Sequence, residues 1–327
     1  MGEFGRRCVE DELEWAYEAP KLLAACDELF LRGSEPRICQ QVRNFTMTWN
    51  PDKFLSRTPE QLKKHYEIEK ELAARLRNAS AEERRFLYSA LYDELYRRVP
   101  DHPQLTIKTS NEEKTRYVAA QMKLLRRYLS TDTTFLEIGP GDCALSLEVA
   151  RHVKQVYAVD VSDEITKGLA APDNFRLVLS DGSSIPVPPN SVNVAYSNQL
   201  MEHLHPDDAM VQLRGIYNAL ANTGIYICIT PNRLTGPHDI SSYFDATATG
   251  FHLKEYTVSE LTNLFRQAGF SKSRVIVGAR GIYVRSSVLL TILCEKLLDA
   301  VPYPLGKLRV LGRLFRLLLG IRIIGIK

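Results

Sequence analysis

The sequence has 327 residues, of which 45% are hydrophobic and 25% charged, and its formal net charge is +3. These values are ordinary for a globular protein, and the length gives room for one large domain with an appendage, or for two domains. The small net charge argues against nucleic acid as a partner, and six dispersed cysteines without a CxxC pair exclude an evident zinc motif or a small disulfide framework. Because the sequence shows no apolar signal segment and no uncharged apolar stretch that could span a bilayer, we expect a cytoplasmic protein.

Residues 1–109 are expected to form a helical N-terminal region that acts as a lid or binds the acceptor. Sequence signatures of capping boxes predict helix starts here and just beyond, each pairing a hydroxyl residue with a Gln or Glu three positions later: Thr58 with Gln61, Ser80 with Glu83, and Ser110 with Glu113. Phe45 and Trp49, in the aromatic stretch NFTMTWNPDKF, are candidates to cover a pocket.

From Thr133 the pattern changes to short apolar runs that alternate with helical segments, which is typical of a parallel α/β sheet. The predicted strands are 134–138, 155–160, 175–180, 192–197, 224–230, 274–279 and 320–327. We therefore expect residues 110–327 to form a Rossmann-like, doubly wound α/β domain of seven strands, with the last strand antiparallel. On this reading the segment 287–319 is an insertion before the last strand.

A glycine turn follows the first predicted strand. Gly139, Gly141 and Asp160 have the spacing of a dinucleotide-binding fingerprint, so the turn alone also fits an NAD-dependent oxidoreductase. Glu137 and Asp142 flank the turn, and unpaired carboxylates there would repel a pyrophosphate by several kcal/mol. A ligand with an adenosine, a positive charge and no phosphate fits better, and S-adenosylmethionine (SAM) has these parts.

Residues 133–279 resemble a class I SAM-dependent methyltransferase, most closely the small-molecule group that includes the quinone-pathway methylases. FLEIGPGDC resembles the first motif of that family, with Cys143 in place of its last glycine, and VYAVDVS resembles the second. LVLSDGSSIPVPPNSVNVAYSNQLMEHL resembles the third and fourth motifs together.

The resemblance implies SAM as the cofactor and a set of residues that bind it. These are Glu137, Gly139, Gly141, Asp160, Val161, Asp181, Gly182, Ser183, Ser197 and Asn198. By the same resemblance Asp160 holds the ribose hydroxyls, Asp181 reads the adenine amino group, and Ser197 and Asn198 lie under the methionine part.

Candidate catalytic residues follow the fourth and fifth strands. His203 is a candidate general base, and His238 with Asp239 lies on the long segment that should face the acceptor. His252 is interpreted as a residue that merely precedes a helix. Quinone-pathway O-methyltransferases carry a similar E-x-x-E-H segment associated with a divalent ion, but Gln199 replaces the first acid here, so we expect no metal.

The sequence therefore predicts methyl transfer from SAM to a small-molecule or lipid-like acceptor, with O- and C-methylation both open. Tyr243 and Phe244 hint at an apolar or ring-bearing acceptor. The basic segment 303–319 is a candidate for peripheral membrane contact. Two alternatives stay open: the NAD-dependent oxidoreductase, and a non-catalytic SAM-binding partner subunit, which the Cys143 substitution keeps in view.

Overall fold

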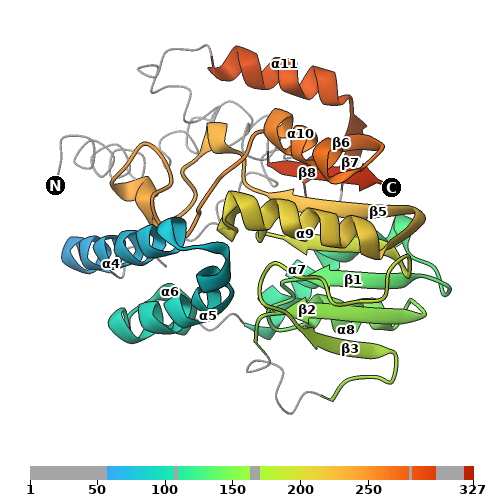
Figure 1. The fold of residues 1–327 in the computed structure, drawn as a ribbon, viewed down its shortest axis with the longest axis horizontal. Coiled ribbons are helices and arrows are strands. Elements are labelled where there is room, and N and C mark those ends of the chain that lie inside the picture. Colours follow the sequence, from blue (N-terminus) through green and yellow to red (C-terminus); the bar gives the residue numbers. More distant parts are fainter. Residues whose placement is uncertain (1–56, 107–109, 163–169, 280–281, 300–319) are drawn as a thin grey trace, which may run out of the picture.

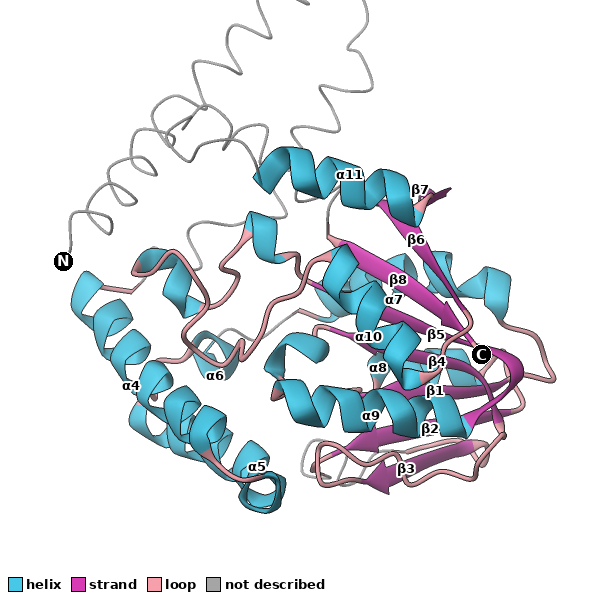
Figure 2. Cartoon of the chain, turned by 45° about the horizontal axis from the view of Figure 1, so that its top comes forward, coloured by secondary structure: helices cyan, strands magenta, loops and turns pink. Residues whose placement is uncertain are grey.

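The computed structural model describes residues 57–106, 110–162, 170–279, 282–299 and 320–327 (Figure 1). The sequence expectations for Phe45, Trp49 and the basic segment 303–319 lie outside these residues. Within them, the helices of residues 59–106 lie beyond one end of the strands of a large sheet, and further helices cover both faces of that sheet (Figure 2). Among the described helices, none is both long and apolar enough to cross a membrane.

The N-terminal helices begin where their caps predict. They are α4 (Pro59–Asn78), α5 (Ala81–Arg98), α6 (Pro103–Thr106) and α7 (Asn111–Leu125), which continues as a 3-10 turn, η1 (Arg126–Tyr128). Thr58, Ser80 and Ser110 each form a complete capping box, so two otherwise unpaired backbone donors are satisfied at each start. The predicted helix starts are confirmed.

The sheet has eight strands in the order β3-β2-β1-β4-β5-β8-β6-β7. Strands β1 to β5 pair in parallel, whereas β8 runs antiparallel to both β5 and β6, as expected for the last strand. The bounds are β1 Thr134–Ile138, β2 Gln155–Asp160, β3 Phe175–Leu179, β4 Val192–Asn198, β5 Leu220–Thr230, β6 Lys272–Ala279, β7 Ile282–Ser286 and β8 Ile321–Ile326. The predicted fold class is confirmed.

The structure adds β7 to the seven strands expected from the sequence. This strand covers Ile282–Ser286 and pairs antiparallel with β6 alone, so it is an edge of the sheet. A five-residue edge strand with one neighbouring strand has a weaker apolar pattern in the sequence than a buried central strand. The apolar helix α11 follows β7 at once, so its helical periodicity dominates the sequence pattern of this region.

Helices cover the two faces of the sheet separately. The remaining helices are α8 (Ala144–Ala150), α9 (Pro206–Ala219), α10 (Val258–Ala268) and α11 (Val288–Asp299), with short 3-10 turns η3 (Met201–His203), η4 (Arg233–Thr235) and η5 (Ile240–Tyr243). One buried cluster joins the sheet to α4, α5, α9 and α10, and a second joins it to α7 and α8. A capping box starts α10 at Thr257, and Gly269 ends the helix in the left-handed conformation.

The N-terminal helices are bonded to the sheet domain through buried polar contacts. Arg84 of α5 donates to both carboxylate oxygens of Asp208 on α9, at 2.6 and 2.8 Å, and the Tyr88 hydroxyl donates to the same carboxylate at 2.7 Å. Arg77 of α4 donates to backbone carbonyls in 249–252. These bonds hold α4 and α5 beside the carboxyl ends of the parallel strands (Figure 1).

Candidate functional site

The residues predicted to bind a cofactor meet at the carboxyl ends of four neighbouring strands. Ile138 of β1 pairs with Val159 of β2 on one side and with Ser197 of β4 on the other, so the segments that follow lie together. Asp160 pairs with Leu179, which brings the loop after β3 to the same edge. Because β1 lies between β2 and β4, the site is at the point where the strand order reverses, the usual ligand position in such sheets.

The turn after β1 needs glycine for its backbone. Gly139 has φ 68° and Gly141 φ 55°, in the left-handed region that costs other residues about 1–2 kcal/mol. The Gly139 N–H donates to the Val159 carbonyl at 2.9 Å, which fixes the turn against β2. A Cβ built on Gly141 would have no protein atom within 4 Å, so this part of the turn faces open space.

Cys143, the departure from the family motif, is a buried residue at the start of α8. It adopts φ 57° without being a glycine, and its side chain is fully buried. Burial raises the pKa of its thiol to about 12, so the thiol is neutral at physiological pH. The geometry is that of a neutral core thiol.

Glu137 and Asp160 are two carboxylates withdrawn from solvent beside the turn. Glu137 is buried, its Oε2 accepts a hydrogen bond of 2.5 Å from the Ser146 hydroxyl, and burial raises its pKa to about 7. Asp160 is half-buried, accepts from the Val161 N–H at 2.7 Å and from the Gly141 backbone, and burial raises its pKa too. Val161 itself is 40% exposed beside it.

Asp142 has a partner that the sequence did not suggest. Lys114 of α7 lies 2.8 Å from its carboxylate, in an ion pair whose two side chains are both exposed. The expectation that two unpaired acids at the turn repel a pyrophosphate is therefore wrong for Asp142. At neutral pH Glu137 is also close to half protonated, so electrostatic repulsion at this turn is weaker than the sequence implied.

The loop after β3 folds around Asp181. One carboxylate oxygen accepts from the N–H groups of Ser183 and Ser184 at 3.0 and 2.8 Å, and the other lies 3.4 Å from Arg85. Although burial opposes it, these backbone donors lower the pKa of Asp181. At Gly182, φ is 91° and an added Cβ would come within 2.9 Å of the Tyr88 ring, so α5 packs directly on this loop.

At the end of β4, Ser197 and Asn198 have different surroundings. The Ser197 side chain is buried and its hydroxyl bonds the Tyr226 hydroxyl at 2.7 Å, so it is engaged within the sheet. The Asn198 amide donates to the Tyr117 hydroxyl at 2.6 Å. Of the two residues, Asn198 is the one presented beside α7.

One face of α7 lines this edge of the sheet, and sequence reasoning missed it. Its polar residues contact three positions of the site or its supporting strand: Lys114 with Asp142, Tyr117 with Asn198, and Gln121 with Tyr196. Spacings of three and four residues place Lys114, Tyr117 and Gln121 on one helical face. That spacing was readable in the sequence, but nothing there indicated what the face would meet.

His203 lies on η3, where β4 leads into α9. Its Nδ1 is 3.1 Å from the Phe251 carbonyl and 3.0 Å from the Tyr92 hydroxyl. A carbonyl only accepts, so Nδ1 carries the proton and Nε2 keeps its lone pair. Burial lowers the pKa of His203 to about 4, so the ring is neutral at physiological pH.

The structure gives His238 and Asp239 bonding roles within their own segment. Asp239 accepts from the N–H groups of Ser241 and Gly250, at 3.0 and 3.1 Å, and closes the segment on itself. His238 bonds Glu255 through both its backbone N–H and its Nδ1, at 2.8 and 3.2 Å. Their catalytic role remains a prediction, and these contacts provide an alternative, structural reason for both residues.

His252 lies closer to His203 than the sequence suggested. The two rings meet edge to face with centroids 4.8 Å apart, and His252 Nδ1 bonds Glu255 at 2.7 Å. Burial opposes protonation, yet this bond to Glu255 raises the pKa of His252. Glu202, His203 and His252 each offer one atom that could bind a metal ion, and these three atoms lie within 4.8 Å of one another. Oε1 of the buried Glu202 has no hydrogen-bond partner.

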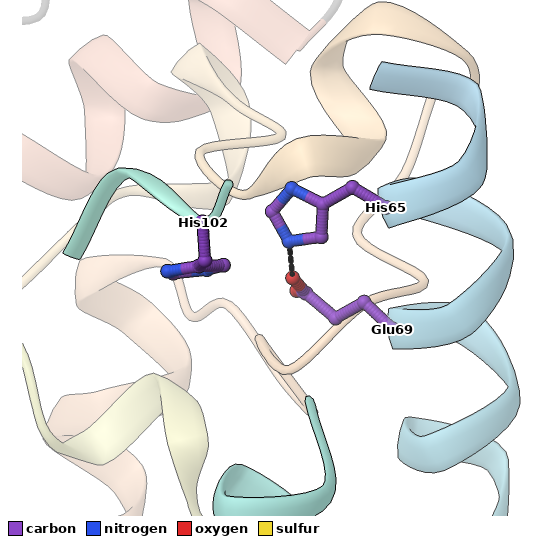
Figure 3. Close-up of side chains that lie close together, drawn as sticks. All are labelled: His65, Glu69 and His102. Atoms are coloured by element: carbon purple, nitrogen blue, oxygen red, sulfur yellow. Dashed lines mark hydrogen bonds and ion pairs between the residues drawn. The ribbon is translucent and has the colours of Figure 1, made fainter. Parts of the chain in front are cut away.

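A second cluster of the same residue types lies under α4 (Figure 3). His65 and Glu69 project from one face of α4, with a bond of 2.8 Å between them, and His102 approaches from the other side. Arg57 donates to His65 Nδ1 at 2.9 Å, so Nε2 must carry the proton that Glu69 accepts. With both ring nitrogens of His65 engaged and a guanidinium adjacent, the geometry favours a hydrogen-bonded cluster over a cation site.

Comparison with known proteins finds a family match over the segment that carries most of the predicted site residues. Residues 136–228 match a family described as a methyltransferase domain. A curated protein of Mycolicibacterium smegmatis, named "Probable S-adenosylmethionine-dependent methyltransferase", is 29% identical over 157 residues, which are 47% of this chain and 58% of that protein. The chain therefore spans less than two thirds of the length of this relative.

Solved structures with a similar fold include two methyltransferases. A SAM-dependent methyltransferase from Archaeoglobus fulgidus is 17% identical, with 73% of this chain and 100% of that chain covered and a TM-score of 0.43. Phosphoethanolamine N-methyltransferase 1 of Haemonchus contortus, solved with phosphoethanolamine and S-adenosylhomocysteine, is 16% identical, with 68% and 55% covered and a TM-score of 0.47. At these scores neither structure indicates an acceptor for this chain.

Proposed function

We propose that this chain, whose residues 136–228 are a methyltransferase domain of the SAM-dependent kind, transfers a methyl group to a small-molecule or lipid-like acceptor. The observation that carries the proposal is the convergence of the Gly139–Gly141 turn, Asp160 and the Asp181 loop at one switch point of the sheet. The match to a methyltransferase domain favours this function over the NAD-dependent oxidoreductase. Methyl transfer from labelled SAM, measured in a cell extract, separates it from the non-catalytic partner subunit.

The residues at the turn fit SAM. Asp160 offers a half-buried carboxylate for ribose hydroxyls, and the open space beside Gly141 allows a ligand to approach the backbone. Glu137 is a buried carboxyl with pKa about 7, which a neighbouring ammonium would shift to its charged form. Asp181 keeps one oxygen directed away from its own loop bonds, toward Arg85, and is the proposed partner of the adenine amino group.

The proposed general base is His203. SAM, when bound, supplies an electrophilic methyl group, so the protein must position the acceptor and, for a hydroxyl or amine, remove its proton. His203 holds its proton on Nδ1 through Phe251, which leaves Nε2 as the acceptor atom. His252 lies against the His203 ring, so a proton that arrives on Nε2 has a second imidazole beside it.

The acceptor pocket is proposed to form between the N-terminal helices and the segment after β5. Tyr92 of α5 stacks on Phe251 with ring centroids 4.6 Å apart and bonds His203. Tyr66 of α4 stacks on Phe244 at 4.4 Å. These contacts join α4 and α5 to the 231–252 segment and support the proposal that residues 1–109 act as a lid or acceptor-binding region.

The proposal is tested by calorimetric titration of the full chain with S-adenosylhomocysteine and, separately, with NADH. Asp160→Ala should weaken S-adenosylhomocysteine binding by about 10- to 100-fold, because it removes hydrogen bonds to a charged group worth about 1.5–3 kcal/mol. Asp173→Ala is the matched control, since Asp173 is an exposed carboxylate near the opposite end of the strands. NADH binding without S-adenosylhomocysteine binding would refute the proposal.

A further inference from the structure

Helix α11 carries an apolar face that the methyltransferase site does not use. Its members, called here the leucine face, are all exposed, by 79%, 57%, 54% and 62% respectively: Leu289, Leu290, Leu293 and Leu297. At 3.6 residues per turn these positions fall within an arc of about 100°. Single exposed leucines are ordinary on protein surfaces, but a continuous stripe of four indicates an interaction surface.

The apolar surface continues from α11 onto the edge of the sheet. A shallow groove between α11 and the β6–β7 hairpin is lined by Val277, Gly278, Val284, Arg285, Ser286, Ser287 and Leu290. Val284 of the edge strand β7 is 64% exposed and lines the same groove as Leu290. The leucine face and Val284 therefore form one apolar strip, which runs from α11, the helix at the top of Figure 1, to the edge strand β7.

The exposed charges in the described residues 282–297 are both positive. Glu295 is the single carboxylate there, and it is buried, where it accepts from the Asn232 side chain at 2.7 Å and from the Val258 N–H at 2.8 Å. Arg285 and Lys296 are exposed. The inward bonds of Glu295 therefore keep its negative charge off the outer face of α11, whose one other acid in the sequence, Asp299, is the last residue of the helix.

The sequence that follows α11 has the same charge. Residues 300–319 contain Lys307, Arg309, Arg313 and Arg316 and no Asp or Glu. A cover made from these residues, or from the same face of a second copy of the chain, would bury the leucines but would place further cations beside Arg285 and Lys296. The partner that suits both features is apolar and anionic at once.

We propose that the leucine face and Val284 form a docking surface for a membrane that contains anionic lipids. The leucines would enter the boundary between headgroups and acyl chains, and Arg285 and Lys296 would lie at the level of the anionic headgroups. The docking is peripheral, and it does not depend on the proposed methyl transfer.

Co-sedimentation of the full chain with vesicles tests this proposal. The protein should sediment with phosphatidylcholine vesicles that contain phosphatidylserine, less with phosphatidylcholine alone, and less as salt is added. The double variant Leu289→Gln/Leu293→Gln should lower the partition coefficient at least about tenfold. The control is Phe86→Gln/Val211→Gln, which removes side chains of similar exposure, 74% and 54%, from α5 and α9, and it should bind like the unaltered chain.

Cys294 allows a second measurement that leaves the leucines in place. It is exposed beside the leucine face, whereas Cys143 and Cys228 are buried. With Cys8, Cys26 and Cys39 replaced by serine, an environment-sensitive fluorophore on Cys294 should shift its emission to the blue with phosphatidylserine vesicles. No sedimentation, equal binding by the leucine variant, or no spectral shift would each overturn the proposal. A variant that changes oligomeric state or melting temperature while it still binds vesicles would instead assign the leucine face to a second copy or to the chain itself.

Discussion

The Ser146 hydroxyl donates a hydrogen bond of 2.5 Å to the Glu137 carboxylate, and so ties the first turn of α8 to the last residues of β1. This bond favours the ionised carboxylate, but burial outweighs it and the pKa of Glu137 rises to about 7. A group at the centre of the proposed cofactor site is therefore poised to change its charge near physiological pH.

Glu137 should make the stability of the ligand-free protein fall with rising pH. The ordinary pKa of a glutamate is 4.5, so between pH 4.5 and 7 the folded protein holds a proton that the unfolded chain has released. The stabilisation is complete below pH 4.5 and is lost as the pH rises to 7, on the order of 3 kcal/mol in all. Melting temperatures across this range should show a flatter profile for Glu137→Gln than for the unaltered chain, and parallel profiles would contradict the assignment.

Gly141→Ala should separate cofactor binding from folding. The new methyl group meets no protein atom within 4 Å, so the loss of stability is limited to the left-handed backbone, about 1–2 kcal/mol. The same methyl group projects into the space assigned to the cofactor, so affinity for S-adenosylhomocysteine should fall at least about tenfold, or about 1.4 kcal/mol. If calorimetry on the folded variant shows unchanged affinity for S-adenosylhomocysteine, the cofactor does not bind beside Gly141.

His203→Asn should slow methyl transfer by about 10²- to 10⁴-fold at saturating cofactor, because it removes the proton-accepting Nε2. An asparagine amide can still donate to the Phe251 carbonyl, so the local fold should persist. The pKa of His203 is lowered to about 4 by burial, so protonation of this residue should not reduce turnover between pH 8 and 5. His152→Asn, at an exposed position in the turn that follows α8, is the control. Equal turnover of both variants would leave proximity as the source of catalysis.

Arg84→Met should lower the free energy of unfolding more than a substitution that breaks an exposed ion pair. It leaves Asp208 buried with only the Tyr88 hydroxyl, a change that costs about 3–5 kcal/mol. Arg75→Met breaks an exposed pair with Glu94, at 2.8 Å, and should cost less than about 1 kcal/mol. Urea unfolding followed by circular dichroism compares the two, and similar midpoints would show that the Arg84–Asp208 pair contributes little.

A chelator should leave methyl transfer unchanged. Burial raises the pKa of Glu202 to about 7, so a proton can occupy its unpartnered Oε1 without a cation. Turnover is measured before and after dialysis against EDTA. A different result would identify Glu202, His203 and His252 as a metal centre: EDTA lowers turnover, Zn²⁺ or Mg²⁺ restores it, and the Glu202→Gln variant shows no such restoration.

Local features of the fold were predictable from the sequence. The capping boxes at Thr58, Ser80 and Ser110 and the glycine turn at 139–141 depend on residues within a few positions of each other. Buried central strands are also recognisable in the sequence as short apolar runs, whereas the edge strand β7 is not. The cofactor residues were proposed from motifs in the same segments, which is why their convergence could be expected.

What the sequence determined by itself is the capped helix starts, the central strands, the glycine turn and the residue types offered at the ends of the strands, because caps, periodicity and left-handed turns act over a few residues. The tertiary structure alone decided that Lys114 neutralises Asp142, that Phe251 fixes the proton of His203, and that Glu295 is turned inward on α11. These contacts join segments far apart in the chain, and the burial they create sets pKa values and partners that no local pattern encodes.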